Sequence, residues 1–217
     1  MHFVDAWVSL PPLDLIRLLL PAGFLVLAVF LPGRGTARLT ALGVALCLPL
    51  VRELEVPPRL LVAWVGLWIL IAWQAGRVTS GARRSLTTRL AGMEPGSVGL
   101  LIGAALLALL LAAVARQDLA PEATRRAAYG LLLIDLGLLH LMLRRHALRA
   151  AVAFGALGLG VQVLDGMARV GEVGVTPSTA GVVLATAIAV AITVRLAGSR
   201  ESAAGTAWVT DAHDLRD

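Results

Sequence analysis

Seven long apolar stretches follow one another along the 217 residues, and they restrict the fold more than any other feature of the chain. A helix needs ~20 mostly apolar residues to cross the hydrocarbon core of a bilayer. The stretches lie at about 14–31, 38–51, 60–75, 97–115, 125–143, 149–167 and 176–196. They predict an all-α integral membrane protein with about seven transmembrane helices, in which residues 1–196 form one domain and residues 197–217 a cytoplasmic polar tail. The second stretch is short, so it either crosses with little tilt or is partly re-entrant.

Composition excludes several classes of protein. Charged residues make up 15% of the chain and hydrophobic residues 58%, whereas soluble domains carry about 25% charged residues. The net charge of +5 comes from arginines in short loops between apolar stretches, where they orient helices and meet anionic lipid rather than nucleic acid. The chain has no lysine, which excludes a retinal Schiff base. Cys47 is its one cysteine, so neither an internal disulfide nor a cysteine-ligated cluster can form within the chain.

The distribution of arginines predicts the orientation. Twelve lie on the side of the C-terminus and six on the opposite side. Because positive residues favour the cytoplasmic side, the N-terminus is expected outside and the C-terminus in the cytoplasm. The turn between the fifth and sixth stretches carries a cytoplasmic basic cluster, formed by Arg144, Arg145 and Arg149.

Three ionisable side chains lie inside the hairpin of the fifth and sixth stretches, and they are the candidate site. Asp135 and His140 belong to the fifth stretch and Asp165 to the end of the sixth. Such groups are expensive at membrane depth and usually face a protein interior or a water path. Counting from the turn, Asp135 falls near the midplane, opposite residues 155–158. The glycines there leave space for water, for a side chain of another subunit, or for a close-packed helix.

These three residues are proton-path candidates at three depths, and each also has a structural interpretation. Asp135 and His140 are about 140° apart around a helix, so a direct pair is not expected. Asp135 is either a functional protonatable group or a neutral, hydrogen-bonded acid. For His140 the sequence favours a neutral ring bonded to a carbonyl or to another subunit. For Asp165 it favours an interfacial position or a pair with Arg169, four residues further on.

No catalytic constellation is recognisable in the sequence. A bis-histidine haem needs ligands on facing helices, and His140 is the one histidine well inside a stretch. Metal-ligand clusters, a serine triad and a phosphate-binding loop are also lacking in the sequence. We therefore expect no cofactor and no enzymatic centre in this chain alone.

The last part of the chain resembles a known family. The run RRHALRAAVAFGALGLGVQVLDG, the following apolar stretch that ends at Arg195, and the tail segment 207–216 are similar to component E of hydrogenase-4 and formate-hydrogenlyase membrane complexes. That family is related to the K subunit of respiratory complex I. The resemblance covers about residues 125–217, of which 125–196 correspond to the K-like part. It implies a multi-pass subunit of the bacterial plasma (inner) membrane, with antiporter-like and other membrane subunits as partners.

One departure from the family changes what the resemblance implies. The family places a glutamate in the sixth helix, in a segment that aligns with Gly158, Leu159 and Gly160. No glutamate role can be carried over, and Asp135 on the adjoining helix is the candidate replacement. The expected function is a non-catalytic subunit of a complex-I-like or group 4 hydrogenase-like energy-converting complex, contributing to or bordering proton or sodium translocation. The alternatives are a scaffold without its own ion path and, ranked last, an independent small-solute transporter.

Overall fold

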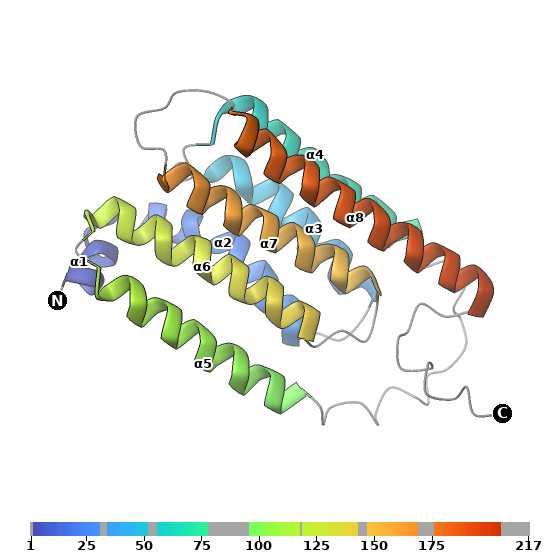
Figure 1. Ribbon diagram of the computed structural model, residues 1–217, viewed down its shortest axis with the longest axis horizontal. Helices are drawn as coiled ribbons and strands as arrows, with labels where there is room; N and C mark the ends of the chain where they lie inside the picture. Colours follow the sequence, from blue (N-terminus) through green and yellow to red (C-terminus); the bar gives the residue numbers. More distant parts are fainter. Residues whose placement is uncertain are drawn as a thin grey trace.

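The computed structural model describes residues 2–30, 34–51, 56–77, 96–117, 119–142, 147–168 and 176–204. These residues form a bundle of α-helices with no strand among them (Figure 1). The elements are α1 (His2–Val8), α2 (Pro12–Phe30), α3 (Arg34–Cys47), the 3₁₀ turn η1 (Leu48–Leu50), α4 (Pro58–Arg77), α5 (Gly96–Ala115), α6 (Pro121–Met142), α7 (Ala147–Ala168) and α8 (Pro177–Ala204). The predicted all-helical fold is confirmed for this part of the chain.

Prolines mark where four of the long helices begin. Pro12, Pro58, Pro121 and Pro177 are the first residues of α2, α4, α6 and α8. The first turn of a helix has backbone N–H groups without intrahelical partners, so a residue that lacks this donor costs nothing there. Each helix therefore starts within a few residues of the apolar stretch that predicted it. α8 differs at its other end, because it continues to Ala204 beyond the expected end of the last span.

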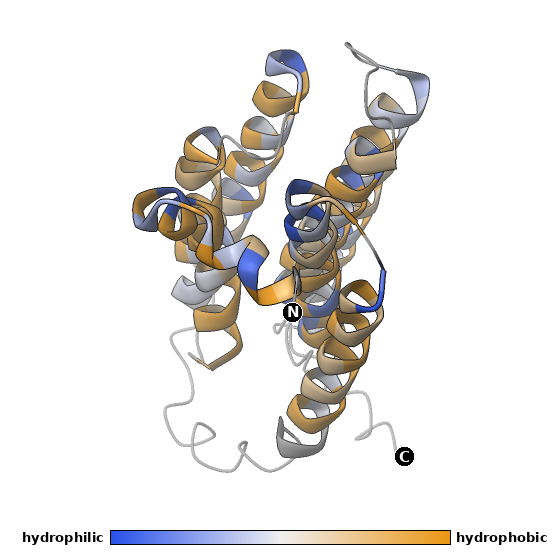
Figure 2. Ribbon diagram, turned by 90° about the vertical axis from the view of Figure 1, so that its left-hand side faces the viewer, coloured by the Kyte–Doolittle hydropathy of each residue, from blue (hydrophilic) through white to orange (hydrophobic). Residues whose placement is uncertain are grey.

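Four of the described helices are long and apolar enough to cross a membrane. They are Pro12–Phe30, Pro58–Gly76, Arg149–Ala168 and Pro177–Ser199. Two further apolar helices are shorter, at Gly35–Leu50 and Gly99–Ala115. α6 has sufficient length but carries four charged side chains, at Glu122, Arg125, Arg126 and Asp135. Hydrophobic residues cover most of the helix bodies (Figure 2), as expected for a protein of the membrane.

α7 is the helix around which the bundle is assembled. It packs most extensively against α6 and α8 and also touches α3 and α4. α5 packs along α6 at the edge of the bundle, and α1 lies across the end where α6 begins (Figure 1). The core between the helices is formed by apolar and aromatic side chains, of which Trp64, Trp68 and Tyr129 are the largest fully buried ones.

Some predictions fall outside the described residues. These are the arginines Arg144 and Arg145 of the basic cluster, the pairing of Asp165 with Arg169, and the tail from residue 205 onward.

Candidate functional site

Glycines bring α6 and α7 into direct backbone contact. A Cβ atom added at Gly160 of α7 would lie 2.7 Å from the carbonyl oxygen of Gly130 in α6. A Cβ atom at Gly137 of α6 would lie 2.9 Å from the carbonyl oxygen of Ala153 in α7. Small residues permit this approach, which membrane helices use because lipid gives them little hydrophobic drive to associate. The register of the two helices is therefore set by close contacts at two levels, seven residues apart along α6.

Two other glycines of α7, Gly155 and Gly158, face different helices. Gly155 lies against the ring of Trp68 in α4, which comes within 3.0 Å of the position of an added Cβ. Gly158 lies against the side chain of Thr186 in α8. Of the three interpretations of the space at residues 155–158, the structure shows close-packed neighbouring helices. This part of α7 therefore leaves no open volume for the carboxyl group of α6.

Asp135 lies at the expected level of α7, but its side chain is on the side of α6 that faces away from α7. The contacts of Gly130 and Gly137 place residues 155–156 of α7 at its level, in agreement with the sequence. Around the helix, Asp135 is about 40° from Leu139, which packs against Gly103 of α5. The carboxyl group is therefore directed toward the α5 side of α6, away from the surface that contacts α7.

The environment of Asp135 is apolar. Its side chain is 3% exposed, and its Oδ1 atom has no hydrogen-bond partner among the described residues. α5, the helix on this side, consists of glycine, alanine, leucine, isoleucine and valine apart from Ser97 in its first turn. A buried carboxyl group without a partner is costly, especially in its charged form. The sequence-based alternative of a hydrogen-bonded structural acid is not supported at Oδ1.

His140 points to another helix. Its Nε2 atom donates a hydrogen bond to the backbone carbonyl of Leu25 in α2 over 3.0 Å, and the side chain is 2% exposed. This is the carbonyl-bonded arrangement that the sequence favoured. Asp135 and His140 therefore face different neighbours, as their spacing along the helix predicts.

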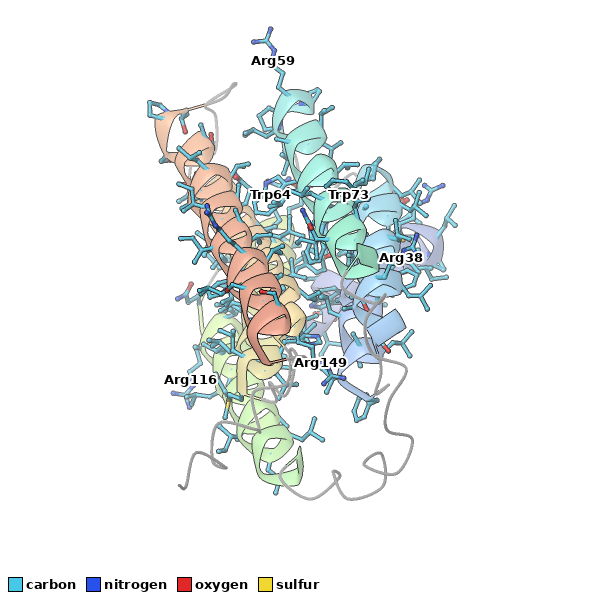
Figure 3. The ribbon with its side chains drawn as sticks, turned by 90° about the vertical axis from the view of Figure 1, so that its right-hand side faces the viewer. Arg38, Arg59, Trp64, Trp73, Arg116 and Arg149 are labelled. Carbon is cyan, nitrogen blue, oxygen red and sulfur yellow. The ribbon has the colours of Figure 1, made fainter. Side chains whose placement is uncertain are left out.

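Asp165 lies at the far end of α7 and joins this helix to the start of α8. Both of its carboxylate oxygens accept hydrogen bonds from the hydroxyl of Ser178, over 3.2 and 3.3 Å, in an exposed position. The structure thus gives Asp165 a local partner at the end of the bundle. Arg149, the described member of the basic cluster, lies near the beginning of α7 (Figure 3). The three proton-path candidates do not form one site within the described part of this chain.

Sequence reasoning missed the buried polar residues of α4 and α7. Trp64 and Trp68 of α4 are fully buried. Gln162 of α7 is 2% exposed, and its Oε1 atom has no hydrogen-bond partner among the described residues. The available signal was a glutamine in the middle of an otherwise apolar stretch.

The described residues contain no group of three or more histidine, cysteine, aspartate or glutamate side chains that could hold a metal ion. Comparison of the chain with protein-family models, with curated proteins and with solved structures finds no match. The chemistry that the described site offers is protonation of a carboxyl group inside the bundle.

Proposed function

We propose that this chain is a seven-helix, non-catalytic subunit of a complex-I-like or group 4 hydrogenase-like energy-converting complex in a bacterial plasma membrane. In this role it takes part in, or borders, the translocation of protons or sodium ions. The resemblance of residues 125–217 to component E supports the choice of complex. The buried acid of α6 supports the link to ion movement.

The proposed topology counts α2 to α8 as the seven spans, with the N-terminus outside and the C-terminus in the cytoplasm. α6 belongs to this set because it packs along α7, one of the helices with full spanning character. The charges of α6 are compatible with crossing, because Glu122, Arg125 and Arg126 are all in its first two turns. There a long side chain can reach the headgroups or, as Arg125 does, a backbone carbonyl of α1. Asp135 is then the one charged residue in the central part of this helix.

The observation that carries the proposal is the position of Asp135. An acid with an unpartnered oxygen in an apolar setting destabilises the fold, and such groups in membrane proteins mark ion pathways. The carboxyl group would accept and release a proton on the α5 side of α6. His140 and Asp165 have hydrogen-bond partners of their own, so the proposed path does not require them.

The proposed partners are antiporter-like and other membrane subunits, bound through helices at the edge of the bundle. Large apolar side chains are exposed along α5 and α8, among them Leu101, Leu109, Leu184 and Ile192. Exposed apolar surface of this kind meets lipid or neighbouring subunits. α5 lies beside the Asp135 side of α6, so a subunit bound there would be near the proposed path.

The experiment is the Asp135→Asn variant in inverted membrane vesicles that contain the assembled complex. The vesicles are energised with H2, formate or NADH, whichever donor drives acidification with the wild-type protein. We expect acidification to be lost while the complex still assembles, since asparagine keeps the size of the side chain and cannot carry a proton. Asp165→Asn is the matched control and should acidify normally. Normal acidification by Asp135→Asn would contradict the proposal.

A second candidate is a scaffold subunit without its own ion path. It is favoured by the close packing at the glycines of α7, where Gly130, Trp68 and Thr186 occupy the space beside the helix. It is also favoured by the hydrogen-bond partners of His140 and Asp165. For a scaffold, Asp135→Asn leaves acidification intact, whereas variants that separate the helices disrupt assembly. The two candidates therefore give opposite results in the same vesicle experiment.

A further inference from the structure

Three buried polar atoms lie on α4 and α7, at positions that helix geometry directs toward the junction of these helices with α8. They are Nε1 of Trp64, Nε1 of Trp68 and Oε1 of Gln162, and none has a hydrogen-bond partner among the described residues. Trp64 and Trp68 are 0% exposed and Gln162 is 2% exposed. Buried polar groups are nearly always hydrogen-bonded, so three at one junction require a partner.

The contact of Gly155 fixes how α4 and α7 meet. Its added Cβ would lie 3.1 Å from Cζ2 of Trp68 and 3.2 Å from Cδ1 of Ile71. Gln162 is seven residues further along α7, two helical turns, so it faces the same way as Gly155. Trp64 is one turn before Trp68 on the antiparallel α4, so both side chains lie in this interface.

Trp64 and Gln162 also lie at similar levels along the interface between α4 and α7. The ring of Trp64 lies about 6 Å further along the interface than the ring of Trp68, which is the level of residue 159 in α7. Helical side chains lean toward the N-terminus of their helix, which brings the amide group of Gln162 back toward the same level. Leu159 is fully buried in the same core cluster as Trp64. Trp64 lies on the side of α4 that faces α8, whereas Trp73 lies on the opposite side (Figure 3).

α8 closes the junction without supplying a partner for these atoms. The contact of Gly158 with Thr186 places residue 182 of α8 near the level of Gln162. The Thr186 hydroxyl donates to the carbonyl of Val182 over 2.7 Å. The hydrogen of this hydroxyl is therefore used within α8 and is not donated to the amide oxygen of Gln162.

We propose that ordered water is bound at this junction, between the indole N–H of Trp64 and the side-chain amide of Gln162, with Trp68 one turn away. The indoles can only donate, whereas the amide presents an acceptor or a donor according to its orientation. Water accepts from the indole and donates to the amide oxygen, and it serves the amide equally well when its oxygen and nitrogen are exchanged. Internal water of this kind bonds otherwise unsatisfied groups. The site is separated from Asp135 by α7 and does not depend on the proposed function.

The test uses the full chain in nanodiscs, labelled with ¹⁵N at the indole nitrogens of tryptophan. The Trp64 resonance is assigned by its loss in the Trp64→Phe variant. In the wild-type protein we expect a cross-peak between the Trp64 indole proton and water, of the sign that marks a long-lived bound molecule. In Gln162→Leu, which removes the amide and keeps a similar size, this cross-peak should be lost.

Gln74→Leu is the matched control. Gln74 also lies within a long apolar helix, α4, but near its other end, so the cross-peak of Trp64 should persist in this variant. The proposal is overturned if the wild-type indole proton shows no contact with water, or contacts the Gln162 side chain alone. Persistence of the cross-peak in Gln162→Leu also overturns it. The wild-type spectrum decides between a hydrated and a dry junction even where the variant fails to fold.

Discussion

The imidazole of His140 is hydrogen-bonded to the backbone carbonyl of Leu25, 115 positions earlier in the chain. The bond joins the end of α6 to α2. α2 is also held by α3, where the Thr40 hydroxyl donates to the carbonyl of Phe24 over 3.4 Å. Two consecutive backbone carbonyls of α2 thus accept hydrogen bonds from side chains of different helices. His140 is in this way a structural link between the first helices of the bundle and the α6–α7 hairpin.

The first prediction concerns this link. His140→Leu removes a buried hydrogen bond and should lower the free energy of unfolding by about 0.5–1.5 kcal/mol, measured by thermal unfolding of the purified chain. His140→Gln keeps a donor and should lose less. Acidification by vesicles with His140→Gln should equal that of the wild type. A loss of acidification in both variants would show that the imidazole itself is needed and would contradict the structural role.

Gly160 gives a sharper prediction, because its neighbour is backbone. Gly160→Ala places a methyl group against the carbonyl of Gly130 and the backbone nitrogen of Ile134, at 2.7 and 3.0 Å. Neither can rotate away, so α6 and α7 must separate, at a cost of about 1–3 kcal/mol. The measurement is the unfolding temperature in detergent, together with the yield of folded protein.

Gly166 of the same helix is the control for this substitution. An added Cβ at Gly166 meets nothing within 4 Å. Alanine is the better helix former by about 0.8–1.0 kcal/mol, so Gly166→Ala should leave stability unchanged or raise it. Equal destabilisation by Gly160→Ala and Gly166→Ala would show that the helix contact is not the cause.

Gly158 tests the packing of α7 against α8. Gly158→Ala collides with the side chain of Thr186, whose Cγ2 lies 2.7 Å from the added atom. Because the obstacle is a side chain, Thr186→Ala should relieve it. We expect the double variant to be more stable than the sum of the two single changes predicts, by about 0.5–3 kcal/mol. A purely additive cycle would mean that the strain of Gly158→Ala is released elsewhere.

The helices themselves were largely predictable from the sequence. Long apolar stretches and the prolines before them define where α2, α4, α6 and α8 start, because both signals act within a few residues of the helix. The level of Asp135 relative to α7 and its separation from His140 follow from helix geometry alone. These predictions hold because they need no knowledge of which helices are neighbours.

The predictions that were wrong, and the features that were not predicted, depend on tertiary contacts. The glycines of α7 looked like space beside Asp135, but Gly155, Gly158 and Gly160 face α4, α8 and α6 in turn. The acceptor of His140 and the group around Gln162 come from helices distant in the sequence. α1 was not predicted, since seven residues with two aromatic rings give only a short pattern. Its position depends on a contact with α6.

That contact supplies the last prediction. Nη1 of Arg125 donates to the carbonyl of Ala6 over 2.8 Å, and Arg125 is 7% exposed although it carries a charge. This charge-assisted hydrogen bond should hold the short helix α1 against the first turns of α6. In Arg125→Met, which keeps most of the side-chain length, we expect amide hydrogen exchange of residues 2–8 to become faster by about tenfold or more, the equivalent of losing about 1.4 kcal/mol of local stability. Arg116→Met, at an exposed position after α5, is the control and should leave exchange in α1 unchanged. Equal protection of α1 in both variants would mean that its apolar contacts, such as buried Ala6, suffice to hold it.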